Sequence, residues 1–392
     1  MILPRFATAL LVSTLLLTAC SSESGWSPSP DEPRAFVTTL GSDTLSVEVY
    51  TRDSERITGI LADRVPYTHV IEYDVALNDL GNMASLDMTM TTPDTNPDGP
   101  EPTSVRVAVD GSTATVTREG GSNEGTSEVS VPDGVLLTLG RAASAAFVFE
   151  QVAMQLRADQ PIHLLGATSA AARQNDAGII DADTVFMDYF GKQRKAWTDK
   201  QDQLLGITGK GTTNKSETRR VEPMLIGSMA DRWAAMDVSG AGMGTPSPAA
   251  TTLATVDGAD LEVRYSQPAK RGRDIWGGLV PNGTIWRTGA NAATHFTTSR
   301  DLVIGGETLA AGTYTLWSLY EDGAFSLIVN EQTDQWGTAH DAAFDLFSVP
   351  MSSQTLDAVQ ERFVIGVEDT AEGGVLTLTW DQTVWSVAFT VQ

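Results

Sequence analysis

Alternation of apolar and polar residues with a period of two recurs along much of this chain, and no other feature constrains the fold as strongly. The alternation is clear at 45–49, 71–77, 86–90 and 105–109. Successive side chains of a β-strand point to opposite faces of a sheet, so this period predicts strands with one buried face. We therefore expect a mainly β fold.

A helical spacing of apolar residues replaces this alternation between Leu139 and Leu156, where they recur every three or four positions. This spacing predicts one long helix. Strand-like segments follow at 162–167, 183–190 and 203–209, and a short helix is predicted at 228–236. We expect an N-terminal β-rich domain, residues 35–237, in which an antiparallel sheet or half-barrel wraps around the long helix.

Residues 238–254 are uncharged and rich in Gly, Ala, Pro and Thr, a composition that predicts a linker. The domain that follows, residues 255–392, has many short strand-like segments and is predicted to form an antiparallel β-sandwich. Its last two strands are expected to form a hairpin that turns at Asp381-Gln382. Trp380 shares its parity with apolar neighbours, which predicts that it lies in the core.

The N-terminus carries the features of an export signal. Its apolar run, Phe6 to Ala19, follows Arg5 and is too short to span a bilayer. Leu17-Thr18-Ala19-Cys20 resembles the lipobox of bacterial lipoproteins, which implies cleavage before Cys20 and lipidation of its thiol. The alternative is an ordinary cleavage site that leaves Cys20 as a free thiol. We expect residues 1–20 to be the signal peptide and 21–34 a flexible tether that holds the protein on a membrane of the cell envelope, periplasmic or at the outer surface.

Composition excludes several classes of partner and site. Acidic residues number 50 against 26 basic ones, so the chain repels phosphate backbones and no nucleic acid is expected as a partner. Cys20 is the only cysteine, and with its thiol acylated no thiol remains, which excludes disulfides and thiolate metal sites within the chain. The longest apolar candidate after the signal, 135–157, contains Arg141 and Glu150, so no further membrane span is expected.

The second domain carries a long ordered set of motifs. They are Tyr265-Ser266-Gln267-Pro268, Lys270-Arg271-Gly272-Arg273, Trp276-Gly277-Gly278-Leu279-Val280-Pro281, Trp286-Arg287-Thr288-Gly289-Ala290-Asn291, Ala311-Gly312-Thr313-Tyr314-Thr315-Leu316-Trp317 and Gln335-Trp336-Gly337. Through these motifs the domain resembles the bacterial domain of unknown function 2911. Tyr320 departs from the family pattern, in which an Ile-Pro step usually follows the Gly-Thr-Tyr strand. The resemblance implies exported bacterial proteins with no established activity.

Five basic residues lie between positions 264 and 287, where Asp274 is the only acid. Such a cluster can form a pocket that accepts a small acidic ligand or an envelope component, because arginine forks bind carboxylate and phosphate. The alternative is that these arginines brace loops by bonding carbonyl groups and carboxylates. Trp336 lies outside any alternating strand, so its ring is a candidate for stacking on a ligand. The candidate ligand-binding residues are Arg271, Arg273, Arg287, Thr288, Asn291 and Trp336.

Metal and catalytic patterns are weak. Asp94, Asn96 and Asp98 match the opening of a calcium loop, but Val105 occupies the position that needs a bidentate Glu. His295 and His340 lack metal-ligand spacing, although folding could bring them together. No cofactor is expected, and no nucleophile-elbow or zinc-protease motif occurs. We therefore expect a membrane-anchored envelope binding protein; the alternatives are a hydrolase that uses His295, His340 and acids, or a purely structural envelope protein.

Overall fold

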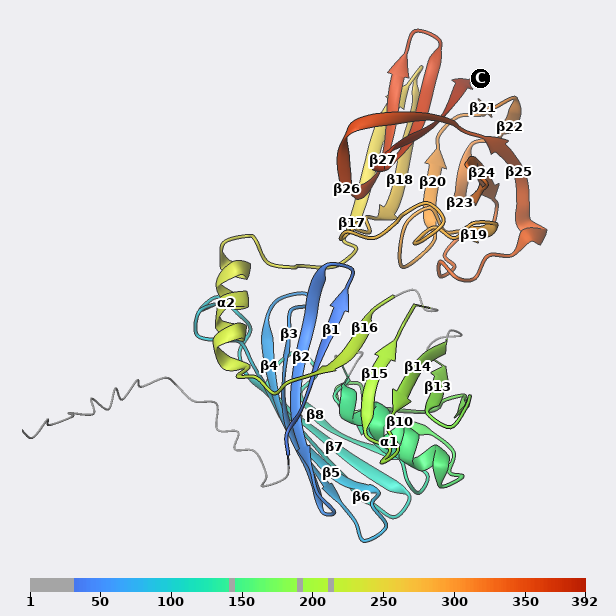
Figure 1. The fold of residues 1–392 in the computed structure, drawn as a ribbon. Coiled ribbons are helices and arrows are strands. Elements are labelled where there is room, and N and C mark those ends of the chain that lie inside the picture. Colours follow the sequence, from blue (N-terminus) through green and yellow to red (C-terminus); the bar gives the residue numbers. More distant parts are fainter. Residues whose placement is uncertain (1–31, 141–144, 189–192, 211–214) are drawn as a thin grey trace, which may run out of the picture.

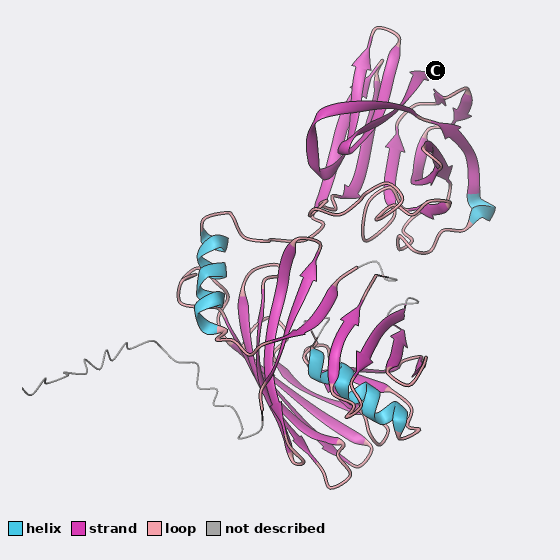
Figure 2. Cartoon of the chain, viewed as in Figure 1, coloured by secondary structure: helices cyan, strands magenta, loops and turns pink. Residues whose placement is uncertain are grey.

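The computed structural model describes residues 32–140, 145–188, 193–210 and 215–392. The predicted signal and lipobox, with Cys20, lie outside the described residues. Strands dominate the described chain, which has two α-helices (Figures 1 and 2). The mainly β fold that the period-two alternation predicts is confirmed.

An antiparallel sheet of 13 strands, here called the N-terminal sheet, occupies residues 34–221. Its strands lie in the order β12-β13-β14-β15-β16-β1-β2-β3-β4-β5-β6-β7-β8, so β1 joins the two halves by pairing with both β2 and β16. The bounds are β1 Arg34–Leu40, β2 Asp43–Arg52, β3 Arg56–Asp63, β4 His69–Leu77, β5 Met83–Thr91, β6 Thr103–Asp110, β7 Thr113–Glu119, β8 Gly125–Ser130, β12 Ala177–Ile179, β13 Thr184–Asp188, β14 Gln193–Thr198, β15 Leu204–Thr208 and β16 Glu217–Val221.

Helix α1, Ala146–Arg157, packs on one face of this sheet. Phe147 and Val152 are fully buried among sheet residues such as Ile57 and Val107. A small sheet formed by β9 (Leu136–Thr138), β10 (His163–Gly166) and β11 (Ala171–Gln174) lies beside the helix, and β9 and β10 are parallel.

The predicted start of this helix at Leu139 is wrong, because the helix begins at Ala146. Leu139 itself is fully buried outside the helix, directly after strand β9, and its burial extended the apolar spacing beyond the true helix start.

Helix α2, Gly227–Val238, covers part of the opposite face. Its Ile226 end and Trp233 pack against Val47 and Ile60 of the sheet. The short helix expected at 228–236 is therefore present, and residues 222–226 connect it to strand β16. Neither described helix has the length and apolarity needed to span a bilayer.

Only residues 239–248 connect α2 to the next strand, so the predicted linker at 238–254 is too long. Its last residues form β17, Ala249–Val256, which pairs along its whole length with β18, Ala259–Ser266. The strand lies at the sheet edge and is half exposed, so its small, uncharged residues carry little apolar signal.

Residues 249–391 form two antiparallel sheets with a shared core, here called the C-terminal sandwich. One sheet has the order β17-β18-β20-β23-β24-β25, with β19 also paired to β23; the other has the order β22-β21-β27-β26. The remaining bounds are β19 Thr284–Trp286, β20 Thr294–Thr298, β21 Leu302–Ile304, β22 Glu307–Leu309, β23 Gly312–Glu321, β24 Ala324–Asn330, β25 Asp345–Pro350, β26 Ser352–Thr370 and β27 Gly373–Val391, with a 3-10 turn at Ala342–Phe344.

The predicted hairpin at Asp381-Gln382 is wrong. β27 runs unbroken through this position and pairs with β26. The hairpin turn between the two strands lies instead between Thr370 and Gly373. Asp381 has a positive φ of 54°, and the pairing register shifts on both sides of its partner Gln360. A bulge of this kind moves the buried face by one residue, so Trp380 and Trp385 are both buried without a chain reversal.

The N-terminal sheet meets the C-terminal sandwich at the β1–β2 turn. The backbone N–H of Ser42 donates to the carbonyl of Arg271 at 2.9 Å, and the Arg271 guanidinium forms an ion pair with Asp43. Gly41 in that turn has a positive φ, and a Cβ there would lie 2.2 Å from the Arg271 carbonyl oxygen. Only glycine permits this close contact.

Candidate functional site

A cavity of about 600 Å³ opens at the end of the sandwich that faces the connecting segment. Its walls come from residues 268–291 and 336–340, from residues 245–247 of the connection, and from Leu40 and Lys215. Its charged residues are all basic: Lys215, Arg273 and Arg287. No carboxylate is among the described residues that line it, although the chain as a whole has a net charge of −24. The local potential therefore favours an anion.

Arg287 enters this cavity from the end of strand β19. The preceding residue, Trp286, is buried in the sandwich core, where it stacks on Trp380 with ring centroids 6.0 Å apart. Thr288 follows with a positive φ of 50°, and its hydroxyl shares a hydrogen bond of 2.6 Å with Ser318. These two anchors hold the backbone of Arg287 on both sides.

The Arg287 guanidinium has no hydrogen-bond or ion-pair partner among the described residues. Its Nε is buried and unsatisfied. Burial lowers the pKa of this guanidinium below its usual value, with no neighbouring charge to oppose the shift. An arginine remains protonated even so. The residue as a whole is half-buried, and its Nε is the atom that is both buried and without a partner, so the guanidinium can accept an anion as a partner.

The turn at Trp336-Gly337 lies directly against the Arg287 side chain. A Cβ on Gly337 would lie 2.1 Å from Arg287 Cδ and 2.4 Å from the Asn291 carbonyl oxygen, so no larger residue fits. The Gly337 N–H donates to that carbonyl at 3.0 Å, and the N–H of Ala339 donates to the Trp336 carbonyl at 2.8 Å. Trp336, a residue that is 55% exposed, lines the same cavity as Arg287.

Asn291 also lines the cavity and has a positive φ of 61°. Its Nδ2 donates to the Ser247 carbonyl at 3.2 Å and to Ser266 Oγ at 3.3 Å. The side-chain amide thereby ties the connecting segment to the sandwich, and its wall position depends on both bonds.

The other predicted pocket residues have structural contacts instead. Arg271 is buried in the ion pair with Asp43 and does not line the cavity. Arg273 borders the cavity, but its Nε and Nη2 donate to the carbonyls of Lys270 and Ala269 at 3.0 and 2.6 Å. Thr288 is fully buried and bonded to Ser318. The expectation that all the arginines converge on one pocket is therefore wrong: bracing describes Arg271 and Arg273, and the pocket hypothesis survives at Arg287.

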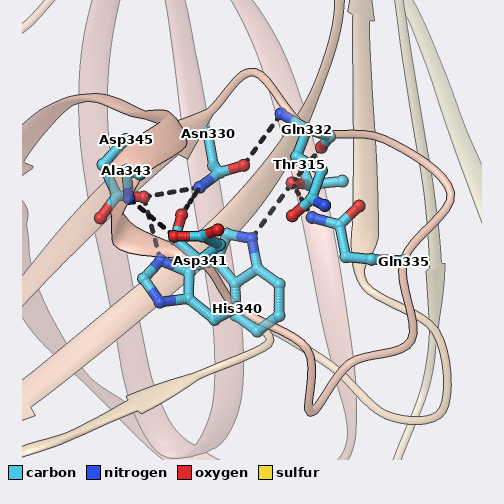
Figure 3. A network of polar contacts seen from close by, with 9 residues as sticks. Thr315, Asn330, Gln332, Gln335, His340, Asp341, Ala343 and Asp345 are labelled. Atoms are coloured by element: carbon cyan, nitrogen blue, oxygen red, sulfur yellow. Dashed lines mark hydrogen bonds and ion pairs between the residues drawn. The ribbon is translucent and has the colours of Figure 1, made fainter.

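A polar network on the same wall includes His340 (Figure 3). His340 Nε2 is 2.9 Å from Asp345 Oδ1, and this oxygen also accepts from Asn330 Nδ2 at 2.8 Å. Asn330 Nδ2 bonds the Asp341 carbonyl as well, at 2.9 Å. The contact with Asp345 favours the tautomer with hydrogen on Nε2, so the unbonded Nδ1 of His340 is the nitrogen able to accept a proton.

His295 does not join this network. Its Nδ1 lies 3.0 Å from the Ala293 carbonyl, and its Nε2 accepts from the Asp334 N–H at 3.0 Å. Both ring nitrogens are used to hold the loop before Trp336, and the residue does not line the cavity. Among the described contacts, none joins His295 to His340.

No group of three or more metal-ligating His, Cys, Asp or Glu side chains occurs in the described part of the chain. Asp94, Asn96 and Asp98 lie in the turn between β5 and β6, where Asn96 N–H donates to the Pro93 carbonyl at 2.9 Å and Gly99 N–H donates to the Asn96 carbonyl at 3.0 Å. Backbone turns of this kind account for the polar residues at these positions.

A second buried charge site lies between helix α1 and the N-terminal sheet. Glu48 of β2 accepts from Tyr73 Oη at 2.6 Å and from the N–H of Ala146, the first residue of α1, at 2.5 Å. Burial, opposed only in part by these bonds, raises the pKa of Glu48 from 4.5 to about 7. The helix N-terminus lacks a side-chain cap of its own, so Glu48 supplies it from a distant strand.

Glu150 lies one turn further along the helix. It forms an ion pair with Arg34 and accepts from Tyr50 Oη and from the Leu204 N–H, both at 3.0 Å. Every one of these partners comes from a different strand. Sequence analysis did not identify this cluster, because Glu48 and Glu150 have no pattern that separates a buried carboxylate from a solvated one.

Comparisons with known proteins bear on the C-terminal sandwich. Residues 247–389 match the model of the family DUF2911, described as a protein of unknown function. The resemblance seen in the sequence motifs is confirmed, and the match begins two residues before β17. A crystal structure of a DUF1089 family protein from Pseudomonas aeruginosa is similar with 10% identity and a TM-score of 0.29, covering 43% of this chain and 92% of that one. A comparison with curated proteins gave no match. The sandwich is thus similar to a family of domains of unknown function.

Proposed function

We propose that this protein is a lipid-anchored bacterial envelope protein that binds a carboxylate-bearing small ligand in the cavity at Arg287. One observation carries the binding part: a guanidinium with a buried, unsatisfied Nε lines a cavity without described carboxylates, in a chain of net charge −24. An arginine fork bonds both oxygens of a carboxylate, and such a ligand would supply the missing partner.

The anchor rests on the sequence alone. Leu17-Thr18-Ala19-Cys20 supports lipidation of Cys20, and residues 21–34 would stand the folded part off the membrane. Cys20→Ser should abolish incorporation of labelled fatty acid and leave the precursor unprocessed. Equal labelling of the variant and the natural protein would contradict the anchor without affecting the cavity.

The binding part is tested by calorimetric titration of the full chain with a panel of carboxylates. Arg287→Gln should weaken the affinity for every carboxylate by about tenfold or more, the loss expected for one charged hydrogen-bonding partner. Arg264→Gln is the matched control, since Arg264 is exposed and pairs only weakly with Glu262 at 3.9 Å. Equal affinities in both variants would contradict the proposal, and the absence of any binding would favour a purely structural protein.

A hydrolase is the second candidate, favoured by the His340–Asp345 contact on the cavity wall. An imidazole oriented by a carboxylate is the arrangement of a general base, which would activate a water against an ester or amide held by Arg287. His340→Gln should abolish turnover in an ester panel if this candidate holds. Turnover that survives in the variant would contradict it.

A further inference from the structure

Trp336 is unusual among the described aromatic residues because the residue is 55% exposed while backbone hydrogen bonds hold the turn around it. The residue forms an isolated bridge with Ala292, and the two hydrogen bonds around Gly337 and Ala339 fix the turn on either side. Most other tryptophans of the sandwich are buried in its core. An exposed tryptophan that lines a cavity and whose backbone is held can serve as a platform for a flat apolar surface.

The platform and the unpaired cation lie within reach of one small molecule. Gly337 follows Trp336 directly and packs on the Arg287 side chain, so the backbone that holds the indole contacts the stem that holds the guanidinium. A ligand with a carboxylate on Arg287 would therefore extend its body toward Trp336.

The rest of the wall supplies groups that suit hydroxyls. Thr245, Ser247 and Thr338, each with a hydroxyl side chain, line the same cavity. Hydroxyl side chains both donate and accept, as sugar hydroxyls do. An aliphatic carboxylate would leave these groups and the indole face without contacts.

We infer that the ligand is a saccharide bearing a carboxylate, with its acid group on Arg287 and the apolar face of its ring on Trp336. This inference rests on the proposed binding function and names its ligand class. Two sources share this chemistry: a hexuronic acid polymer, and an amino sugar with a lactyl carboxylate such as occurs in cell-wall glycan.

The experiment is calorimetric titration of the full chain with four probes: a galacturonic acid trimer, N-acetylmuramic acid, a neutral galactose trimer and succinate. The variants are Trp336→Ala, Trp336→Phe and Arg287→Lys. Phe344→Ala is the control, because Phe344 is an exposed aromatic residue of the same sandwich outside the cavity.

We expect one acidic saccharide to bind at least about tenfold more tightly than succinate or the neutral trimer, since only it uses both anchors. Trp336→Ala should weaken the affinity for the acidic saccharide about tenfold and leave the affinity for succinate unchanged. Trp336→Phe should retain most of the affinity for the acidic saccharide. Arg287→Lys should weaken the binding of the acidic saccharide and of succinate. Tighter binding of the galacturonic acid trimer identifies a hexuronic acid polymer, and tighter binding of N-acetylmuramic acid identifies the cell-wall source.

Two outcomes overturn the inference in distinguishable ways. If succinate binds as tightly as the acidic saccharides and Trp336→Ala has no effect, while Arg287→Lys still weakens binding, the saccharide is wrong and the anion site stands. If no probe binds, or Arg287→Lys changes nothing, the proposed function fails with it.

Discussion

The protein holds two kinds of buried charge, and they differ in whether the fold satisfies them. Between helix α1 and the N-terminal sheet, Glu150 of the helix has three partners from three strands, and Glu48 of β2 caps the helix. In the C-terminal sandwich, the guanidinium of Arg287 has no partner among the described residues. Hydrogen bonds and an ion pair within the fold offset the cost of desolvating the two glutamates. The guanidinium of Arg287 has no such partner and can still bind a ligand. The contrast separates charges that stabilise structure from a charge left for a ligand.

The largest loss of stability on the sandwich side is expected from Trp380→Ala. Trp380 is 1% exposed, stacks on Trp286 and donates from Nε1 to the Glu361 carbonyl at 3.1 Å. Truncating a large aromatic side chain in a packed core costs about 3–5 kcal/mol of unfolding free energy. Urea denaturation measures it. A loss below about 1 kcal/mol would mean that aromatic packing does not stabilise this side.

A comparable loss is expected on the other side from Glu150→Ala. The variant leaves Arg34, Tyr50 and the Leu204 N–H buried without their common acceptor, which costs about 3–5 kcal/mol. Glu128→Ala is the control, since Glu128 is exposed on edge strand β8 and its removal should change stability by less than about 0.5 kcal/mol. Equal urea midpoints for the two variants would break the comparison.

Glu48 predicts a pH dependence of the same site. Its pKa is about 7 in the folded state against 4.5 for an ordinary carboxyl, so the folded protein binds the proton more tightly. This contribution is fully present below pH 4.5 and is lost as the pH rises through 7, by roughly 3 kcal/mol at most. Glu48→Gln does not titrate, so the stability difference between the two proteins should change across this window. A flat difference curve would show that the raised pKa is absent.

The smallest effect on stability is expected from Arg287→Gln, which removes a half-buried cation that has no partner among the described residues. We expect the unfolding free energy to change by less than about 1 kcal/mol, or to rise, because the cost of burying the charge disappears. Thermal melts test this without a ligand. A loss of several kcal/mol would mean that Arg287 has a bracing role like that of Arg273, and the distinction between the two charge sites would collapse.

Particular elements show how far the sequence reaches. The period of two located several strands of the N-terminal sheet, among them β2, β4, β5 and β6, because a half-buried strand must alternate. The alternation predicted a hairpin turn at Asp381. The structure has a bulge there, which moves the buried face by one residue, and a hairpin would produce the same change of parity. The alternation also missed β17, an edge strand with few apolar contacts to impose a pattern. Of the candidate residues, Arg287, Asn291 and Trp336 line the cavity, whereas Arg271 and Thr288 do not and were grouped with them only because they are neighbours in sequence.

Sequence by itself determined the mainly β class, the family resemblance of the C-terminal sandwich and the set of residues from which a site could be built. These depend on local period and on motif identity, which are properties of the chain. Only the tertiary structure decided which arginine is satisfied. Arg271 forms an ion pair with Asp43 of the β1–β2 turn, which is far away in the chain. Arg287 packs against Gly337 in the turn beside Trp336 and contacts no carboxylate among the described residues. Whether a charge has a partner is a matter of distance in space, and no local pattern encodes it.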